Sequence, residues 1–326
     1  MSTLRVVVRI AYADQYVDTM NYFRAVYASG EMSRRALDLT EEAIDLNGAN
    51  YTVWHYRWEL AMGLGVDVND ELGYAEAMAV RNPKNYQVWN HMRLCVAALG
   101  TTEVAARSLA FVAENALAAD AKNYHAWSHR AWIVRTFANR WAEELAYVEA
   151  MIDDDVRNNS AWNQRFVCVV ESGRLDDGGG GADAEIAFAE ARVERAPDNE
   201  SAWNYLRGVL RHDGVGWSHG GHGERIARMY VDDARGEGRD AAEAEAGDDE
   251  TKAGPSGRSP NRHAMSLLTE VRLAEAAAGA GTAAGAAAAA EAADLLARLA
   301  AVDPVRANYY AFRRAHVLGN LAGPGG

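Results

Sequence analysis

The sequence contains few cysteines and lacks a long apolar run. Cys95 and Cys168 are its 2 cysteines, each in an apolar helical context, so neither a disulfide scaffold nor a cysteine-rich metal site can be built. Glu275 and Glu291 interrupt the Ala- and Gly-rich stretch 274–293. Without a run of about 18 apolar residues, no membrane span is predicted. No secretory signal is evident at the N-terminus, and a reducing, cytoplasmic setting is expected.

The chain also lacks the positive charge of a nucleic-acid-binding surface. Its formal net charge is -13, from 46 acidic and 33 basic residues, and no nucleic-acid partner is expected. Much of the acidity lies in residues 232–250, DDARGEGRDAAEAEAGDDE, whose composition is typical of disorder. With 49% hydrophobic residues overall, the remainder is expected to bury a large core in one extended domain or two compact ones.

An asparagine followed four residues later by tryptophan recurs along the chain, with the tryptophans 35, 38, 35 and 41 residues apart. The five pairs are Asn50/Trp54, Asn85/Trp89, Asn123/Trp127, Asn158/Trp162 and Asn199/Trp203. The intervening segment repeats too, because ELGYAEAM (71–78) returns as ELAYVEAM (144–151), 73 residues later. Periods of this length are typical of stacked helix pairs. The sequence therefore predicts an all-α fold, an α-α superhelix (solenoid) of helical hairpin repeats.

The second repeat shows how one unit is built. Pro83 sets an extended entry, Asn85 can cap a helix, and Gly100 can end it. A companion helix is expected over residues 69–82, where apolar residues recur at helical spacing. About one turn separates each capping asparagine from its tryptophan, so the indole can wedge between neighbouring helices. The tryptophans are expected to be core residues that define the fold, not the chemistry.

The residue before the capping asparagine differs from repeat to repeat. It is lysine only in the second and third repeats, at Lys84 and Lys122. A helix N-terminus presents free N–H groups and a partial positive charge, and an adjacent lysine adds a mobile cation; together these features can bind a phosphate. A solvated lysine in a turn is the alternative, and physical reasoning alone favours it.

Six segments carry the repeat most clearly: YFRAVY (22–27), NGANYTVWHYR (47–57), NPKNYQVWNHMR (82–93), AKNYHAWSHRAWIV (121–134), DVRNNSAWNQRFV (155–167) and DNESAWNYLRGVL (198–210). In order and spacing they resemble the α subunit shared by protein farnesyltransferase and protein geranylgeranyltransferase type I, over residues 8–211 and more loosely over 259–320. The resemblance implies a crescent of helical hairpins wrapped around a β subunit, an α/α barrel that holds a catalytic zinc. Such a heterodimer joins a farnesyl or geranylgeranyl group to the cysteine of a C-terminal CaaX sequence.

The resemblance also implies where cofactors and partners lie. Zn²⁺ is expected on the β subunit and Mg²⁺ with the prenyl diphosphate, while this chain is expected to bind no metal. His219 and His222 have a His-x-x-His spacing, but glycines and a surface loop surround them, and no zinc site is expected there. His91 and His129 are expected to form hydrogen bonds within the solenoid. The pocket that measures the prenyl chain is expected on the partner.

Site residues follow from matching positions to the family. Lys84 matches the lysine that reaches the isoprenoid diphosphate, where a cation stabilises charge on the leaving group. Gln87 matches the glutamine that receives the C-terminal carboxylate of the peptide, and Tyr86 matches a tyrosine at the edge of the same cleft. Lys122 is expected to be auxiliary. Three positions of the next repeat match residues that line the interface near the diphosphate or the peptide: Asn123, Tyr124 and His125.

Several stretches depart from the family pattern. Met92 and Leu206 stand where Trp-x-x-Arg is usual, and arginine follows one residue later in both repeats. The segment before the first helix is short, and residues 279–293 replace a more hydrophobic stretch, which favours a linker or loop. The expected parts of a single domain (1–326) are repeats around 40–215, an acidic Gly-rich linker 232–260 and a divergent repeat region 261–321, with a last unit at 303–321 and Tyr310 in the tryptophan position.

Two other functions remain open. Composition and period alone fit a helical-repeat scaffold that binds protein partners without catalysis. The pair Lys84 and Gln87 separates the two hypotheses, because a scaffold has no use for it. The α subunit of a Rab-type geranylgeranyltransferase has similar repeats, but its members usually carry additional C-terminal domains, and KNYQVW matches the CaaX enzymes better.

Overall fold

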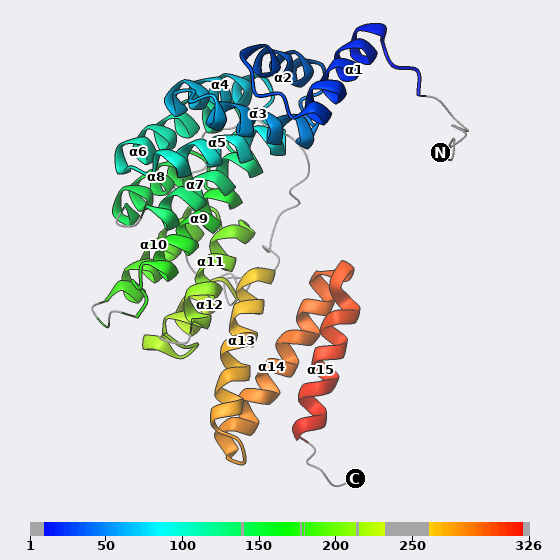
Figure 1. The fold of residues 1–326 in the computed structure, drawn as a ribbon. Helices are drawn as coiled ribbons and strands as arrows, with labels where there is room; N and C mark the ends of the chain where they lie inside the picture. Colours follow the sequence, from blue (N-terminus) through cyan, green and yellow to red (C-terminus); the bar gives the residue numbers. More distant parts are fainter. Residues whose placement is uncertain are drawn as a thin grey trace, which may run out of the picture. The chain divides into compact units, whose positions relative to one another are not determined.

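The computed structural model describes residues 10–137, 140–176, 178, 180–212, 215–231 and 261–321, and every regular element within them is helical (Figure 1). The expected all-α fold is confirmed. The helices are α1 (Asp14–Ser29), α2 (Arg34–Leu46), α3 (Tyr51–Gly63), α4 (Val68–Arg81), α5 (Tyr86–Leu99), α6 (Thr102–Phe111), η1 (Val112–Leu117), α7 (Tyr124–Thr136), α8 (Trp141–Asp154), α9 (Asn159–Glu171), α10 (Gly181–Arg195), α11 (Glu200–Arg211), η2 (His219–Gly221), α12 (His222–Val231), α13 (Arg262–Ala278), α14 (Ala283–Val302), η4 (Pro304–Arg306) and α15 (Ala307–Leu321).

The chain divides into two compact units, residues 1–143 and 144–326. In the first unit, α3 packs against α5 and α5 against α7, while α2, α4 and α6 pack against these helices in turn. In the second unit, α9 packs against α11 and α11 against α13, with α10 and α12 as companions. Both units are therefore stacks of helical hairpins, as the period predicts. The predicted linker 232–260 lies outside the described residues.

Asparagine side chains begin the first helix of every repeat. Asn85 shows the geometry, because its Oδ1 accepts the backbone N–H of Gln87 at 2.9 Å. The same cap occurs at Asn50, Asn123, Asn158 and Asn199. A further cap, Asn261, begins α13 by accepting the N–H groups of His263 and Ala264. A divergent repeat region is expected from residue 261, but the Asn-x-x-x-Trp pattern does not identify this cap because Met265 stands in the tryptophan position.

At four junctions, two within each compact unit, consecutive repeats are tied together through one shared carbonyl. The Pro83 carbonyl accepts the indole N–H of Trp89 at 2.9 Å and the side-chain N–H of Asn123, from the following repeat, at 3.0 Å. Equivalent pairs of bonds end on three other carbonyls, those of Gly48 (Trp54, Asn85), Val156 (Trp162, Asn199) and Pro197 (Trp203, Asn261). At these four junctions, asparagine and tryptophan thus fix where the repeat begins and how it joins its neighbour.

The tryptophans of the repeats lie in the core, as the sequence predicts. The exposed fraction of the five is 0–7%: Trp54, Trp89, Trp127, Trp162 and Trp203. Trp127, in the third repeat, is the most exposed of them at 7%, and its indole N–H donates to the Ala121 carbonyl at 2.9 Å. It therefore bonds back to its own turn, six residues earlier, as Trp89 does with Pro83. Trp127 thus belongs to the packing of the fold and is not assigned a role toward substrates.

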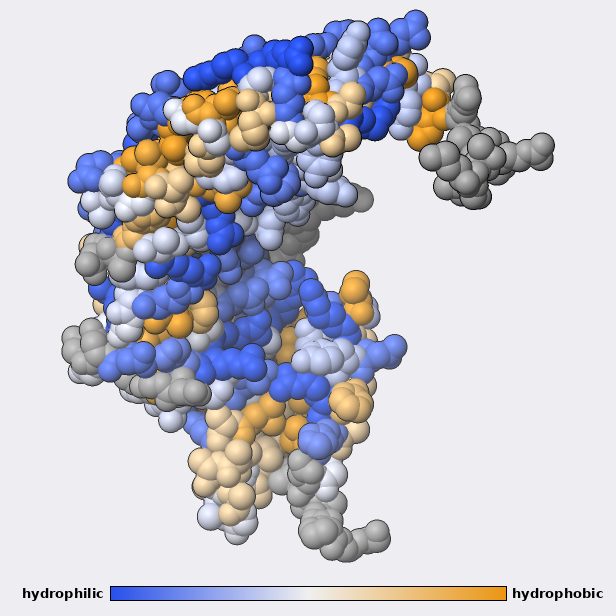
Figure 2. All heavy atoms as spheres, in the orientation of Figure 1, coloured by the Kyte–Doolittle hydropathy of each residue, from blue (hydrophilic) through white to orange (hydrophobic). Residues whose placement is uncertain are grey.

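The C-terminal part corrects the linker interpretation of residues 279–293. Thr282 caps α14, and most of the segment is helix with Ala288, Ala292 and Ala293 buried. Alanine is the best helix former, and its small side chain lets α13 and α14 approach closely. Figure 2 shows apolar residues gathered over the end of this hairpin. Residues 222–231 are also helical, with Ile226 and Val231 buried.

The expected last unit is helical as well. In α15, Tyr310 is buried, and its hydroxyl donates to Asp303 Oδ2 at 3.2 Å. This tyrosine therefore makes a polar bond back to the preceding turn, as the repeat tryptophans do.

Candidate functional site

Lys84 lies in the turn between α4 and α5, one residue before the cap of α5. Its side chain is 76% exposed, and its Nζ lies 3.3 Å from Oδ2 of Asp120, which is 40% exposed. Asp120 belongs to the corresponding turn of the next repeat, before α7. The backbone N–H of Lys122 donates to Asp120 Oδ1 at 3.1 Å. This hydrogen bond, opposed by slight burial and aided by Lys84, lowers the pKa of the Asp120 carboxyl.

A hollow of about 630 Å³ opens beside Lys84. Its lining is Ala49, Asn82, Pro83, Lys84, Asn85, Tyr86 and Gln87. Tyr86 is exposed, and Gln87 is half-buried one residue further along α5. The hollow thus presents a cation, a phenol and an amide at a helix N-terminus, where free backbone N–H groups favour anions.

The next repeat contributes aromatic rings beside the same hollow. The His125 ring meets Tyr86 edge to face with centroids 4.2 Å apart, and Tyr124 lies 5.6 Å from the same imidazole. Partial burial lowers the pKa of His125, against the opposing effect of its hydrogen bond to the Lys84 backbone. Five of the predicted site residues are therefore close together: Lys84, Tyr86, Gln87, Tyr124 and His125.

Asn123 has a different position from the one its predicted role suggests. Its Oδ1 caps α7 by accepting the N–H groups of His125 and Ala126, and its Nδ2 donates to the Pro83 carbonyl. The side chain is 2% exposed. Both ends of this amide therefore serve the fold, and direct contact with a substrate stays a prediction.

Asp120 is the member of the site that sequence reasoning missed. It lies 36 residues after Lys84, and it is one of 46 acidic residues in the chain. The repeat offers a signal in hindsight, because Lys84 and Asp120 occupy neighbouring turns of consecutive units.

Three other hollows differ in chemistry. One of about 1030 Å³ lies among α13, α14 and α15 and is lined mainly by alanine, Tyr309, Phe312 and Val317. A polar one of about 200 Å³ includes Arg306 and Arg313, which are paired with Asp303 and Glu270. These two do not combine an exposed lysine with a helix N-terminus.

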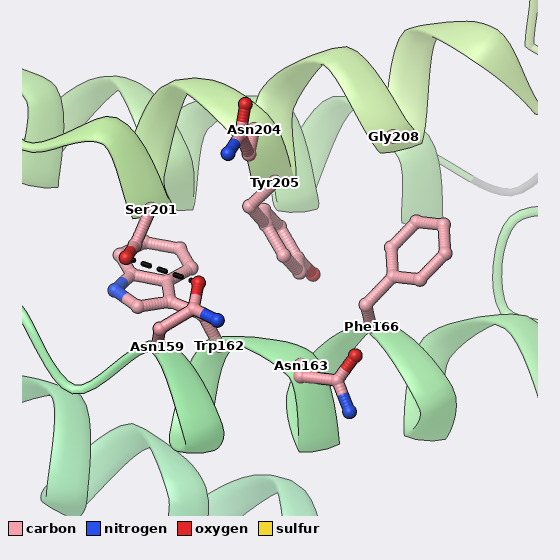
Figure 3. A pocket seen from close by; sticks show the side chains of 8 residues that line it. All are labelled: Asn159, Trp162, Asn163, Phe166, Ser201, Asn204, Tyr205 and Gly208. Carbon is pink, nitrogen blue, oxygen red and sulfur yellow. Dashed lines mark hydrogen bonds between the residues drawn. The ribbon is translucent and has the colours of Figure 1, made fainter.

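The third hollow, between α9 and α11, measures about 160 Å³ (Figure 3). Its lining combines aromatic rings with the amides of Asn159, Asn163 and Asn204, and Ser201 Oγ donates to Asn159 Oδ1 at 3.1 Å. It has no charged lining residue. A diphosphate would therefore find better complementarity beside Lys84.

His91, His129 and Cys95 lie in the interior of the solenoid. His91 Nε2 lies 2.6 Å from Glu71 Oε1, and His129 Nε2 lies 3.0 Å from Ser108 Oγ, as expected for hydrogen bonds inside the solenoid. Burial raises the pKa of Cys95 to about 12. Among the described residues, no cluster of three or more His, Cys, Asp or Glu could hold a metal ion.

In the described part of the chain, no helix is both long enough and apolar enough to cross a bilayer.

Comparisons with known proteins give a consistent family. The repeat described as "Protein prenyltransferase alpha subunit repeat" matches residues 33–63, 68–99, 107–137, 141–171 and 182–213. The protein farnesyltransferase/geranylgeranyltransferase type-1 subunit alpha of Pisum sativum is 34% identical over 229 residues, covering 70% of this chain and 64% of the relative. That of Arabidopsis thaliana is 34% identical over 211 residues, covering 65% of this chain and 64% of the relative.

A solved structure extends the likeness over nearly the whole chain. A chain of the Candida albicans protein geranylgeranyltransferase-I complexed with GGPP superposes with a TM-score of 0.76 and 25% identity. The alignment covers 97% of this chain and 95% of that one. The matches to the two plant relatives span 64% of their length.

Proposed function

This chain belongs to the protein prenyltransferase α-subunit repeat family, and we propose that it is the α subunit of a heterodimeric CaaX protein prenyltransferase. With a β subunit it transfers farnesyl, geranylgeranyl or both from the prenyl diphosphate to the cysteine thiol of a C-terminal CaaX sequence. The allylic C–O bond breaks, a thioether C–S bond forms, diphosphate leaves, and the thiol gives up its proton. The enzyme works in the cytoplasm.

The observation that carries this proposal is the placement of Lys84. Its ammonium projects beside a hollow at a helix N-terminus, where negative charge on a leaving diphosphate would be stabilised electrostatically. Lysine is scarce in this sequence: Lys84, Lys122 and Lys252 are the three lysines among 33 basic residues. Two of the three occupy the same turn in consecutive repeats. A scaffold that uses arginine nearly everywhere else would not need that choice.

Gln87 supports the peptide side of the reaction. It follows Lys84 by three residues and lines the same hollow. An amide N–H is a suitable donor to the terminal carboxylate of a CaaX peptide. Tyr86 and Tyr124 provide exposed rings at its edge, and His125 packs between them.

The remaining chemistry is assigned to the partner. A cysteine thiol becomes a strong nucleophile when a metal lowers its pKa, and Zn²⁺ on the β subunit would supply this. Mg²⁺ would accompany the diphosphate. In this arrangement, the chain contributes one wall of the active site, and the β subunit contributes the zinc and the apolar pocket that measures prenyl length.

The decisive experiment is co-expression of this chain with each candidate β subunit. The purified complexes are assayed for transfer of labelled farnesyl or geranylgeranyl diphosphate to a CaaX peptide, with zinc and magnesium present. An active one-to-one complex supports the proposal, and a stable chain that binds neither partner favours a scaffold. A complex that forms only with a Rab-type β subunit and ignores the CaaX peptide would identify the Rab-type enzyme instead.

Lys84→Ala tests the role of the cation in that complex. Lys84 is exposed in this chain, and the β subunit and the bound diphosphate would desolvate it. Loss of a charge that acts in the transition state of such a complex should lower the rate of the chemical step about 100-fold, with little effect on dimer formation. Lys122→Ala is the matched control, because it removes a lysine from the same turn one repeat later, and its effect should be smaller. Unchanged catalysis in Lys84→Ala would overturn the assignment.

Gln87→Ala tests the amide separately. It should weaken peptide binding more than binding of the prenyl diphosphate. Equal effects on both ligands would contradict a role in carboxylate recognition.

A further inference from the structure

Asp120 is fixed in position by its own turn. Oδ1 accepts the Lys122 backbone N–H at 3.1 Å, and the Asp120 backbone carbonyl accepts the N–H of Asn123 at 3.0 Å. Its second carboxylate oxygen, Oδ2, remains available and lies 3.3 Å from Lys84 Nζ. The carboxylate therefore links a fixed turn of the third repeat to the side chain of the second.

The turn itself does not require a carboxylate. Asn47 occupies the corresponding position of the first repeat, three residues before its capping asparagine. Its amide oxygen accepts the backbone N–H of Ala49 at 3.2 Å, which is the same local bond. Asp155 makes this bond in the fourth repeat, accepting the N–H of Arg157 at 2.9 Å, so the turn can be closed by either side chain and does not depend on the charge. At Asp120 the charge has a use of its own, the contact with Lys84.

The physical effect of this contact is orientation rather than stability. A lysine side chain in solvent populates many rotamers, and Lys84 is largely exposed. An ion pair between two such exposed groups contributes little to folding because water screens it. It does limit where the ammonium lies, and a screened pair can be exchanged for a phosphate oxygen at small cost.

We propose that Asp120 is a positioning residue, which holds the Lys84 ammonium at the mouth of the hollow so that it meets the diphosphate in a productive orientation. Asp120 acts through Lys84 and makes no contact with the reacting atoms. The proposal rests on the proposed function. It means that Asp120, in the third repeat, orients the catalytic Lys84 of the second repeat.

The first test detects the contact between Asp120 and Lys84 by NMR of the lysine side chains and does not depend on catalysis. With three lysines in the chain, selective labelling gives three lysine side-chain correlations, and Lys84→Arg identifies the signal of Lys84. Asp120→Asn keeps the acceptor for Lys122 and removes the charge, so the Lys84 signal should shift. Asp45→Asn is the control, because Asp45 is 44% exposed and forms a comparable inter-helix pair with Arg81 at 2.8 Å. An unchanged Lys84 signal in Asp120→Asn would refute the contact.

The second test uses the complex with the β subunit. Asp120→Asn should lower the single-turnover rate about threefold to tenfold, since small displacements of a catalytic group cost rate. Affinity for the prenyl diphosphate should not fall, because a competing anion has been removed. Asp120→Glu should recover part of the rate, and Asp45→Asn should match the wild type. A parallel loss of rate and affinity would indicate a structural defect and overturn the proposal.

A double-mutant cycle separates this inference from the proposed function. In the Lys84→Ala background, Asp120→Asn should have no further effect on the rate, because there is no ammonium left to orient. Additive losses would overturn the positioning role while leaving that of Lys84 intact. If Lys84→Ala alone has no effect, the proposed function of Lys84 fails first.

Discussion

At the junction between the second and third repeats, the described ion pairs, Lys84–Asp120 and Arg107–Glu76, involve exposed or half-buried residues. The junction between the fourth and fifth repeats has a fully buried ion pair. At the first, Met92 and Ser108 are buried and neutral, and Lys84 pairs with Asp120 at the exposed turn. At the second, Arg165 Nε lies 2.8 Å from Glu185 Oε2, with both side chains buried. Equivalent positions of one repeat therefore carry two different arrangements of charge.

The buried ion pair of Arg165 and Glu185 belongs to a hydrogen-bond network in which Glu185 has several donors. Glu185 accepts hydrogen bonds from Arg165, from Arg174 Nε at 2.9 Å and from the Tyr205 hydroxyl at 2.6 Å, and the Arg165 guanidinium stacks on Phe188 at 3.4 Å. The first repeat has a similar network, in which Arg57 and His91 converge on Glu71. Where arginine is replaced by Met92, the acidic partner is also absent, and Ser108 bonds His129 instead. The charges are present together or lost together, as expected when an unpaired buried charge is costly.

This difference shows which charged groups could exchange their ion-pair partner for a ligand. A buried, fully satisfied carboxylate cannot exchange its partner for a ligand without a large loss of stability. An exposed lysine with one screened partner can exchange that partner for a ligand at small cost. The departure from Trp-x-x-Arg at Met92 thus changes the interior of the junction that carries the candidate site, while Arg93 stacks on Trp132 at 4.9 Å.

The largest expected effect comes from breaking the inner network. Glu185→Gln keeps the shape of the side chain but leaves Arg165 without a buried counter-charge, and it should destabilise the chain by about 3 to 5 kcal/mol. Urea unfolding of the full chain measures the loss. The control is Asp153→Asn, because Asp153 forms an exposed pair with Arg192 at 2.8 Å and should contribute about 1 kcal/mol or less. Equal losses in the two variants would contradict the contrast between inner and outer charges.

The second prediction concerns how stability depends on pH at His129 and Tyr205, which occupy the same position in the two junctions. Burial lowers the pKa of His129 to about 4 from an ordinary value of 6.5, whereas burial and Glu185 raise that of Tyr205 well above its ordinary value. Between pH 6.5 and 4 the unfolded chain binds a proton at His129 that the folded chain does not. His129 therefore contributes stability above pH 6.5 that is lost as the pH falls to 4, by about 3 kcal/mol.

The wild type minus His129→Gln difference in unfolding free energy, followed from pH 7 to pH 4, isolates this effect from the carboxylates. The same difference for a Tyr205→Phe variant should not change between pH 7 and pH 4. A flat difference for His129→Gln would mean that the imidazole is not held neutral.

The helices and their starts could be predicted because their signals are local. Asn85 and Gly100 mark the limits of α5 within a few residues of the observed bounds, Tyr86–Leu99. The period of the tryptophans also identified the hairpin stack, since each unit repeats the same cap and the same indole. Such features depend on neighbours within about six residues, as the bonds from Trp89 to Pro83 and from Trp127 to Ala121 show.

Other features depend on distant partners or on weaker signals. The pairing of Lys84 with Asp120 requires two turns to meet in the fold, and no short motif encodes it. Residues 279–293 lacked the apolar periodicity of a helix, yet α14 forms because alanine tolerates close packing on α13. Asn261 was missed because its repeat has methionine in place of tryptophan, although its bond to the Pro197 carbonyl continues the stack.

The smallest expected effect sharpens the comparison most. Asn123→Ser and Asn199→Ser should each keep the helix cap, since serine is a good capping residue, and lose the bond to the carbonyl of the preceding repeat. Because the indole of Trp89 or Trp162 still occupies that carbonyl, each change should cost about 1 kcal/mol in unfolding free energy. The two variants should therefore be alike in stability.

They should differ in catalysis. Asn123 precedes Tyr124 and His125, and it bonds the residue before Lys84, so Asn123→Ser should lower prenyl transfer by the complex. Asn199→Ser makes the same structural change at a junction without an outer lysine and should leave transfer near the wild-type rate. If both variants lost activity equally, the stack would transmit any disturbance to the active site, and the division between a structural junction and a functional one would have to be abandoned.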